Sequence, residues 1–267
     1  MRKSFSHFDL DYWKKISIFV IIKKNLMSNM EKQKLNRFVS KYNLAGLVES
    51  VKWEVKGGVL TTAFISDDKS VLGSVSMKEF ESGDAVLGVY DTSKLTKMIG
   101  VLGDTVDFSV ADIDGRPIAL KFKDNSVALN YMLADLSVIP NVPDLKKLPE
   151  FDSKIKLDSN FISTFIKAKS ALSDENTFTF VCKDGKGQIV IGYSNINTNR
   201  ITIDVECECE GGDKGPISFS ATYLKEILTA NRDAKDATLS ISSQGLSHIH
   251  FEVDNYTSDY YLVELQG

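Results

Sequence analysis

Two histidines have a spacing that could support metal binding or hydrolysis. His248 and His250 stand two positions apart, so in a strand both would point to one face and could bind a metal ion. No paired acidic or cysteine ligand stands beside them, and we therefore assign no metal site. Because His7 is the only other histidine, a hydrolytic triad would have to use His248 or His250, and no Gly-x-Ser-x-Gly elbow accompanies them. A hydrolase using either one remains an alternative.

The three cysteines are Cys182, Cys207 and Cys209. An odd and sparse set argues against a disulfide-stapled secreted fold and favours a cytoplasmic protein. Cys207 and Cys209 have the spacing of inward positions on a strand. We therefore interpret them as small core residues and not as zinc ligands.

The glycine pairs Gly57-Gly58 and Gly211-Gly212 fit hairpin turns, and the sequence has no Walker or dinucleotide loop. We thus expect a protein that is not an enzyme, with no cofactor and no metal. The formal net charge of −4 excludes a chain that is basic overall. Any contact with nucleic acid would need positive charge gathered on one face.

The 267 residues predict about two domains. Residues 1–29 hold a short apolar run, 16–22, between lysine pairs, which is too short to span a bilayer and lacks a small-residue signal cleavage site. We interpret them as an upstream extension, with Met27 or Met30 as the real start. Residues 136–152 contain Pro140, Pro143 and Pro149 and are typical of a connector. The predicted domains are residues 30–135 and 153–267.

Both domains repeat one order of elements. In the first, Leu35, Phe38, Val39 and Tyr42 indicate a helix, followed by strands near 48–55, 59–65, 71–77 and 86–90. A second helix capped by Asp91 or Thr92 precedes strands near 105–111, 117–123 and 127–133. We expect no strand before the first helix.

The second domain begins with a short strand at 154–157 and a helix capped by Asp158. Strands near 177–183, 188–193, 200–210 and 216–219 precede a helix at 221–231, and strands at 237–242, 248–253 and 259–265 end the chain. Residues 200–210 alternate without interruption and predict one long strand. The fold class is therefore α+β, with two helices per domain covering one face of antiparallel sheets.

Charge placement is the most informative pattern. The four predicted helices carry few acids and a basic set that could face DNA phosphates without reading bases. The candidate DNA-facing residues are Lys32, Lys34, Arg37, Lys41, Lys94, Lys97, Lys167, Lys169, Lys225 and Arg232.

Three stretches together resemble a DNA sliding clamp. They are residues 84–100 (DAVLGVYDTSKLTKMIG), the proline-bearing connector, and residues 258–265 (SDYYLVEL). The chain is similar to the processivity clamps of T-even-like phages and, more distantly, to proliferating cell nuclear antigen. The resemblance implies a homotrimeric ring around double-stranded DNA, with the helices lining the hole and with edges near 127–133 and 200–209 meeting between subunits.

The resemblance also implies partners: a replicative DNA polymerase and an ATP-dependent clamp loader, without a membrane, in a cytoplasm that is the host's if the protein is viral. Partner tails would dock under the connector and beside the last strand. The matching residues are Leu72, Val138, Ile139, Tyr261 and Val263. A non-catalytic β-rich virion structural or binding module is the alternative.

Overall fold

The computed structural model describes residues 28–145, 147–196, 198–210 and 212–265. The first half consists of β1 (Ser28–Glu31), α2 (Lys32–Asn43), β2 (Val51–Lys56), β3 (Val59–Ile65), β4 (Val71–Met77), β5 (Ala85–Val89), α3 (Thr92–Gly100), β6 (Thr105–Ile113), β7 (Arg116–Lys123) and β8 (Ala128–Met132). The second consists of β9 (Ser153–Asp158), α4 (Ser159–Ala171), β10 (Thr177–Lys183), β11 (Lys186–Ile191), β12 (Ile201–Val205), β13 (Cys207–Cys209), β14 (Lys214–Ser220), α5 (Ala221–Ala230), β15 (Asp236–Ser242), β16 (Leu246–Val253) and β17 (Tyr256–Val263).

N-cap hydrogen bonds accepted by side chains fix where α3 and α4 begin. Asp91 accepts a hydrogen bond from the Lys94 amide at 2.7 Å, and Asp158 accepts one from the Phe161 amide at 2.7 Å. Each carboxylate satisfies an amide that has no partner inside the helix, and its charge favours the positive helix end. The predicted cap Asp158 is confirmed, and of the two candidates Asp91 and Thr92 the cap is Asp91.

The repeated order of elements is confirmed, with one correction at its start. We expected no strand before the first helix, but Ser28–Glu31 form β1, which pairs antiparallel with β6. β1 therefore corresponds to β9 in the second half. The strand is only four residues long and its buried positions are Ser28 and Met30, so its alternation is too brief to be read from the sequence.

A second correction concerns residues 200–210. The single predicted strand is two strands in two sheets, because β12 pairs with β11 whereas β13 pairs with β9. Glu206 lies between them. Alternation of side chains continues through this transfer, since a strand keeps its period of two whichever neighbour it has.

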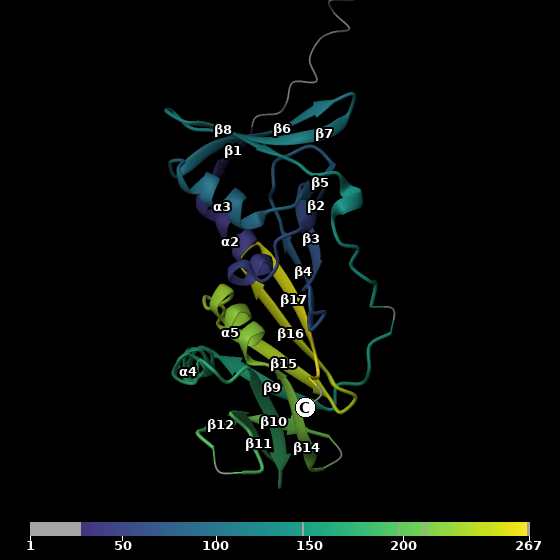
Figure 1. Cartoon of the computed structure of the whole chain (residues 1–267), viewed down its shortest axis with the longest axis vertical. Coiled ribbons are helices and arrows are strands. Elements are labelled where there is room, and N and C mark those ends of the chain that lie inside the picture. The colour runs from purple at the N-terminus through teal and green to yellow at the C-terminus, as the bar shows by residue number, and fades with distance from the viewer. Residues whose placement is uncertain (1–27, 146, 197, 211, 266–267) are drawn as a thin grey trace, which may run out of the picture.

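The strands form three sheets. Two four-stranded sheets have the orders β1-β6-β7-β8 and β12-β11-β10-β14, and a nine-stranded sheet has the order β13-β9-β15-β16-β17-β4-β3-β2-β5. The two halves meet where β17 pairs with β4 over seven residue pairs, from Tyr256↔Met77 to Leu262↔Val71. Figure 1 shows the resulting elongated molecule, with one small sheet at each end.

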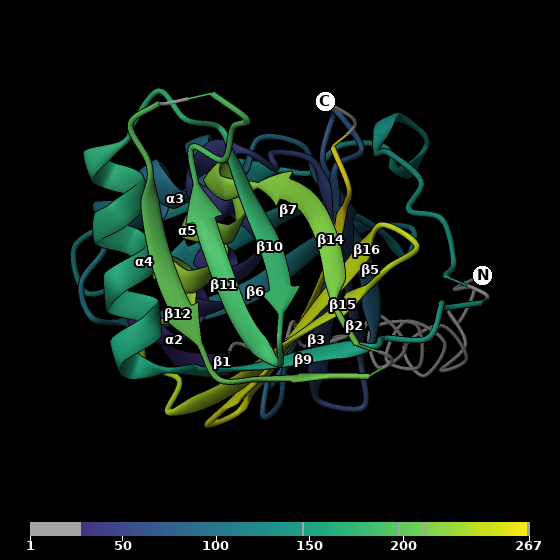
Figure 2. The same ribbon diagram turned by 90° about the horizontal axis from the view of Figure 1, so that it is seen from below.

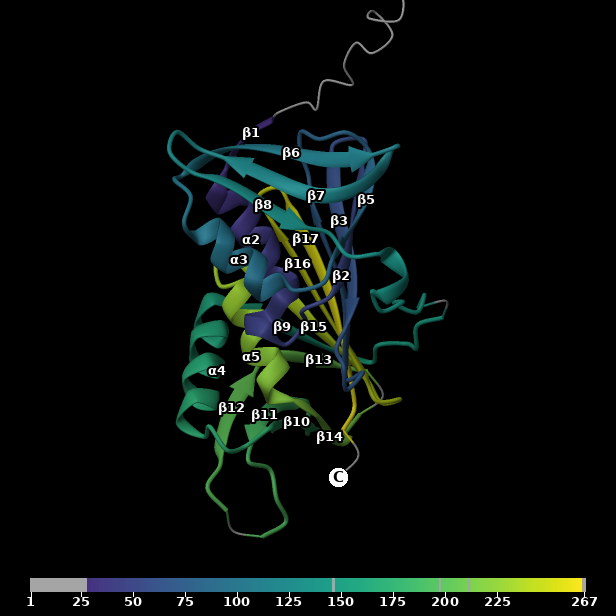
Figure 3. The same ribbon diagram turned by 45° about the horizontal axis from the view of Figure 1, so that its top comes forward.

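The four helices of the described chain lie on one side of the nine-stranded sheet (Figures 1 and 3). Their buried stripes pack on the sheets in one connected hydrophobic core, which includes Phe38 and Leu95 of the first half and Phe165 and Leu224 of the second. The predicted α+β class, with helices gathered on one face of antiparallel sheets, is confirmed.

A buried polar network joins the two halves on the helix side of the sheet. The Lys41 ammonium donates to Asn231 Oδ1 at 2.7 Å and to the Ala230 carbonyl at 3.2 Å. Asn231 donates to the Tyr260 hydroxyl at 3.0 Å, and that hydroxyl donates to the Lys41 carbonyl at 2.8 Å. Burial lowers the pKa of Lys41 to about 8, with nearby Asp233 acting in the opposite direction. The network ties α2 to the end of α5 and to β17.

The connector runs along the opposite side of the nine-stranded sheet from the helices (Figure 1). It begins with a short 3-10 turn, Leu136–Val138, and its Ile139 is buried beside Gly88 of β5. Lys52 of β2 donates to Asn141 at 2.9 Å. In the described part of the chain, helices are too short or too polar to cross a membrane.

Gly73 of β4 allows the two halves to come together. A Cβ at this position would lie 2.7 Å from the Asp259 carbonyl oxygen of β17 and 2.5 Å from the ring of Phe64, which is itself buried. Both contacts are closer than van der Waals packing permits, so a side chain here would push β17 away from β4.

We expect Gly73→Ala to lower the free energy of unfolding by about 1–3 kcal/mol, the usual range for overpacking a core. Urea unfolding followed by tryptophan fluorescence measures the change. Gly215→Ala is the matched control, because Gly215 also lies in a strand but a Cβ there meets nothing within 4 Å. Equal stability of the two variants would contradict the role given to Gly73.

Candidate functional site

The helix side of the molecule carries four exposed basic residues without an ion pair among the described residues. Lys94 and Lys97 lie on α3, Lys167 lies on α4, and Arg232 follows α5. They come from both halves of the chain. This side therefore presents separated positive charges, which suits diffuse contact with a polyanion better than tight binding of one small anion.

Other predicted basic residues are paired with acids that reach the helices from loops. Lys34 lies 3.7 Å from Glu79, and Arg37 pairs with Asp233 and, at 2.9 Å, with Asp254. Each acid stands far in sequence from the basic residue that it pairs with, so a count of charges helix by helix overstates the positive surface.

Two further residues of the predicted DNA-facing set, Lys225 and Lys32, also contact groups of the protein. Lys225 pairs with Glu226 at 3.3 Å, within α5. Lys32 donates to the Leu102 carbonyl. Neither contact removes the side chain from the surface, but Glu226 offsets the charge of Lys225, whereas the neutral Leu102 carbonyl leaves the charge of Lys32 in place.

Two residues of the predicted set are buried, which corrects their assignment. Lys41 is 1% exposed and belongs to the network between the halves, and Lys169 donates to the Ser173 carbonyl at 2.9 Å. Lysine can direct its ammonium to a carbonyl at a helix end as readily as to solvent. Neither residue contributes to an exposed basic surface.

The predicted partner-binding residues fall into two groups. Leu72 and Tyr261 are directly opposite each other on β4 and β17, and Val263 follows on the same face of β17. Val138 and Ile139 lie instead at the β5 end of the sheet, three strand spacings from β4, or about 14 Å. Ile139 is only 3% exposed and packs as a core residue. The sequence alone could not separate the two groups, because the order of strands in the sheet depends on pairing between segments that are far apart in the chain.

A polar cluster lies on the same outer face. Asp259 Oδ1 is 2.8 Å from His248 Nε2 and 2.8 Å from His250 Nδ1. Burial opposes ionisation of Asp259, but the hydrogen bonds from both histidines outweigh it and hold the pKa of Asp259 below its usual value. The His248 ring stacks on Tyr261 with centroids 4.5 Å apart. Asp259 is the third partner that the sequence analysis did not find.

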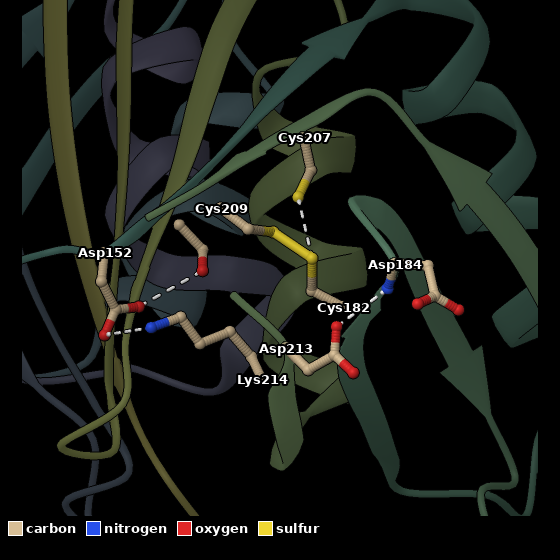
Figure 4. Close-up of a disulfide and its surroundings, with 8 residues drawn as sticks. Asp152, Cys182, Asp184, Cys207, Cys209, Asp213 and Lys214 are labelled. Atoms are coloured by element: carbon tan, nitrogen blue, oxygen red, sulfur yellow. Dashed lines mark hydrogen bonds and ion pairs between the residues drawn. A yellow bond between two sulfur atoms is a disulfide. The ribbon is translucent and has the colours of Figure 1, made fainter. Parts of the chain in front are cut away.

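The cysteines also differ from expectation. Cys182 and Cys209 form a disulfide, and the Cys207 sulfur lies 4.0 Å from that of Cys182 (Figure 4). Cys207 and Cys209 are half-buried and pack against the hydrophobic core as their spacing predicted, but the disulfide of Cys209 was not expected. Cys182 lies on β10, 27 residues from Cys209 on β13, and only the folded chain brings the three sulfur atoms together.

Among the end strands of the sheets in the described chain, β8 and β12 concern the predicted subunit contact. β8 is the last strand of one small sheet and β12 the last of the other (Figures 2 and 3). They fall within the predicted edges near 127–133 and 200–209. A hollow beside β8 is lined by Tyr90, Met98, Met132 and Val138, and Met132 is 62% exposed. An unpaired strand flanked by exposed apolar side chains is a template for pairing with another chain.

Comparison with known proteins supports the fold. No family model and no curated protein matches the chain. Among solved structures, it is similar to the crystal structure of proliferating cellular nuclear antigen from Entamoeba histolytica, with a TM-score of 0.70 and 16% identity over 90% of this chain and 98% of that one. The chain therefore has the two-domain α+β fold of that protein.

Proposed function

We propose that the chain is a DNA sliding clamp, a processivity factor that encircles duplex DNA as a homotrimer and tethers a replicative polymerase without catalysis of its own. The observation that carries the proposal is a correspondence between two pairs of strands. One pair, β17 and β4, joins the two halves of the chain; the other, β8 and β12, consists of end strands of the two small sheets. By the repeated order of elements, β8 occupies the place of β17 and β12 the place of β4. Inside the chain, β17 pairs antiparallel with β4.

Pairing of β8 with β12 of the next subunit would repeat that junction between chains. The contact is heterologous, because the two edges belong to different halves, and heterologous contacts close into rings when the rotation permits. The half-buried side chains Ile201, Ile203 and Val205 of β12 would then be covered. The same arrangement turns all helices toward one enclosed space.

Encirclement explains why the exposed basic residues on the helix side, Lys94, Lys97, Lys167 and Arg232, suffice. A closed ring stays on DNA by topology, so its lining need only tolerate phosphates and permit sliding. A closed ring cannot thread onto circular or long DNA, and the sequence has no nucleotide-binding loop. An ATP-dependent loader is thus part of the proposal. Because the three stretches resemble phage clamps, the proposal also includes a host cytoplasm as the location.

The apolar group on the outer face is proposed as the docking surface for the polymerase. Leu72 is half-exposed on β4, and Val263 is exposed on the neighbouring strand β17. Short apolar tails dock well on such a patch, because side chains fixed on strands lose little freedom.

We expect wild-type protein to have three times the 29.7-kDa chain mass in light scattering after gel filtration. Ile203→Lys should yield monomer, because it places a charge in the covered edge. Asn29→Lys is the control, since Asn29 is exposed on the edge strand β1, which the ring does not use. A monomeric wild type at micromolar concentration would refute the ring.

Reversal of charge on the helix side should weaken contact with DNA. We expect Lys94→Glu/Lys97→Glu/Lys167→Glu to stay trimeric and to bind a fluorescent duplex at least tenfold more weakly at low salt, measured by anisotropy. The slope of log affinity against log salt should fall by roughly 0.9 for each phosphate that the variant no longer neutralises.

The control for this experiment is Lys121→Glu/Lys123→Glu/Lys183→Glu, which makes the same change in net charge at exposed strand positions away from the helices. Equal weakening in both triple variants would mean that net charge alone acts, and would contradict the lining role.

Polymerase binding should depend on the outer apolar group. We expect Leu72→Ala/Val263→Ala to weaken binding of the purified replicative polymerase at least tenfold in surface plasmon resonance, with the trimer intact. Val101→Ala removes a similarly exposed apolar side chain from the end of α3 and should have no effect. If Val138→Ala were the damaging change instead, the docking surface would lie at the start of the connector.

A further inference from the structure

The strand pair β16 and β17 brings three potential metal ligands to one point on the outer face. His248 and His250 stand two residues apart on β16, so their side chains lie on the same face. Asp259 of β17 is directly opposite His250. One atom from each side chain lies within 4.8 Å of the other two. Two histidine nitrogens share a single carboxylate oxygen, each at 2.8 Å.

This donor set matches a known class of cation. Two imidazole nitrogens and one carboxylate oxygen suit zinc and neighbouring divalent transition metals, whereas calcium and magnesium prefer oxygen ligands alone. Zinc binds nitrogen and oxygen at about 2.0–2.2 Å, so tetrahedral ligands stand about 3.4 Å apart. The nitrogen–oxygen distances need to open by only about 0.6 Å to admit the ion.

The ligands are also held in place. All three lie on paired strands and not on loops, and rigid elements keep ligand geometry better. The His248 ring is stacked on Tyr261 and lies 5.9 Å from the Phe151 ring of the connector. The His250 side chain is 46% exposed, which leaves an entry path and room for water as a further ligand.

We propose that His248, His250 and Asp259 form a binding site for one divalent transition-metal ion of the zinc class. Each histidine binds the ion as a neutral imidazole through the nitrogen that faces Asp259, with its single proton on the other ring nitrogen; any further ring proton passes to solvent. Three protein ligands leave at least one coordination position for water. The site links β16 to β17 on the face opposite the helices, and it does not depend on ring formation or on DNA.

The first experiment titrates the untagged full chain, stripped with chelator, with Zn²⁺ in a calorimeter and with Co²⁺ in an absorption spectrometer. We expect one ion per chain and a Co²⁺ spectrum typical of nitrogen and oxygen ligands. A tag is avoided because added histidines bind the same metals. Absence of saturable Zn²⁺ binding at micromolar concentration would overturn the proposal.

Variants assign the ligands. His250→Gln and Asp259→Asn should each weaken Zn²⁺ binding at least tenfold, whereas His7→Gln, the change at the third histidine of the sequence, should leave it unchanged. Unchanged binding in both of the first two variants would refute the assignment. His250 is half-exposed, so its replacement should not unfold the chain, and a thermal melt in chelator checks this.

The cysteines need their own control, because the sulfur atoms of Cys182, Cys207 and Cys209 also lie within metal-binding distance of one another and Cys207 is not in the disulfide. Cys207→Ser should leave Zn²⁺ affinity unchanged. Loss of binding in that variant, or thiolate charge-transfer absorption with Co²⁺, would place the ion at the cysteines and overturn the proposal. As an independent readout, Zn²⁺ should raise the melting temperature of wild type and not of His250→Gln.

Discussion

The pairing of β17 with β4 is the contact on which the rest of the structure depends. Seven residue pairs turn two separate sheets into one of nine strands, and Gly73 lets the backbones approach. On the helix side, the Lys41–Asn231–Tyr260 network satisfies polar groups that the junction buries. A buried network of this kind is costly if any partner is removed, so it favours one relative placement of the halves over sliding alternatives.

The pairing of β17 with β4 also explains why β8 and β12, at the ends of the small sheets, have no partner strand on their outer side within the described chain. Each half has the same order of elements, and each offers one edge that corresponds to a partner in the internal pairing. Only β17 and β4 can meet within one chain, and β8 and β12 are left at opposite ends of the molecule (Figure 1). An open edge normally carries devices against aggregation. Here Met132 and the half-buried side chains of β12 fit the proposed subunit contact better than they fit permanent exposure.

The sequence predicted what local physics determines. Helical stripes, the caps Asp91 and Asp158 and the repeated order follow from spacing within a few residues, and the structure confirms them. It could not predict contacts set by strand order: the transfer of the chain from β12 to β13, the burial of Lys41, and Asp259 beside two histidines. The partners of β13 and of Lys41 are distant in sequence. Asp259 is only 9 to 11 residues from the histidines, but the register of the β16–β17 hairpin, which places it beside them, is not shown by the pattern of either strand alone.

The net charge of the helix side likewise depends on residues that are distant in sequence from the basic residues they contact. Counted along the sequence, the helices are strongly basic, but Asp233 and Asp254 fold back onto Arg37 and Glu79 reaches Lys34. The positive charge that remains is sparse and divided between the two halves. Sparse charge would be a weakness in a protein that binds DNA by affinity, because affinity falls with every phosphate left without a basic partner. In a ring it is an advantage, since retention comes from closure and strong attraction to phosphates would only slow sliding.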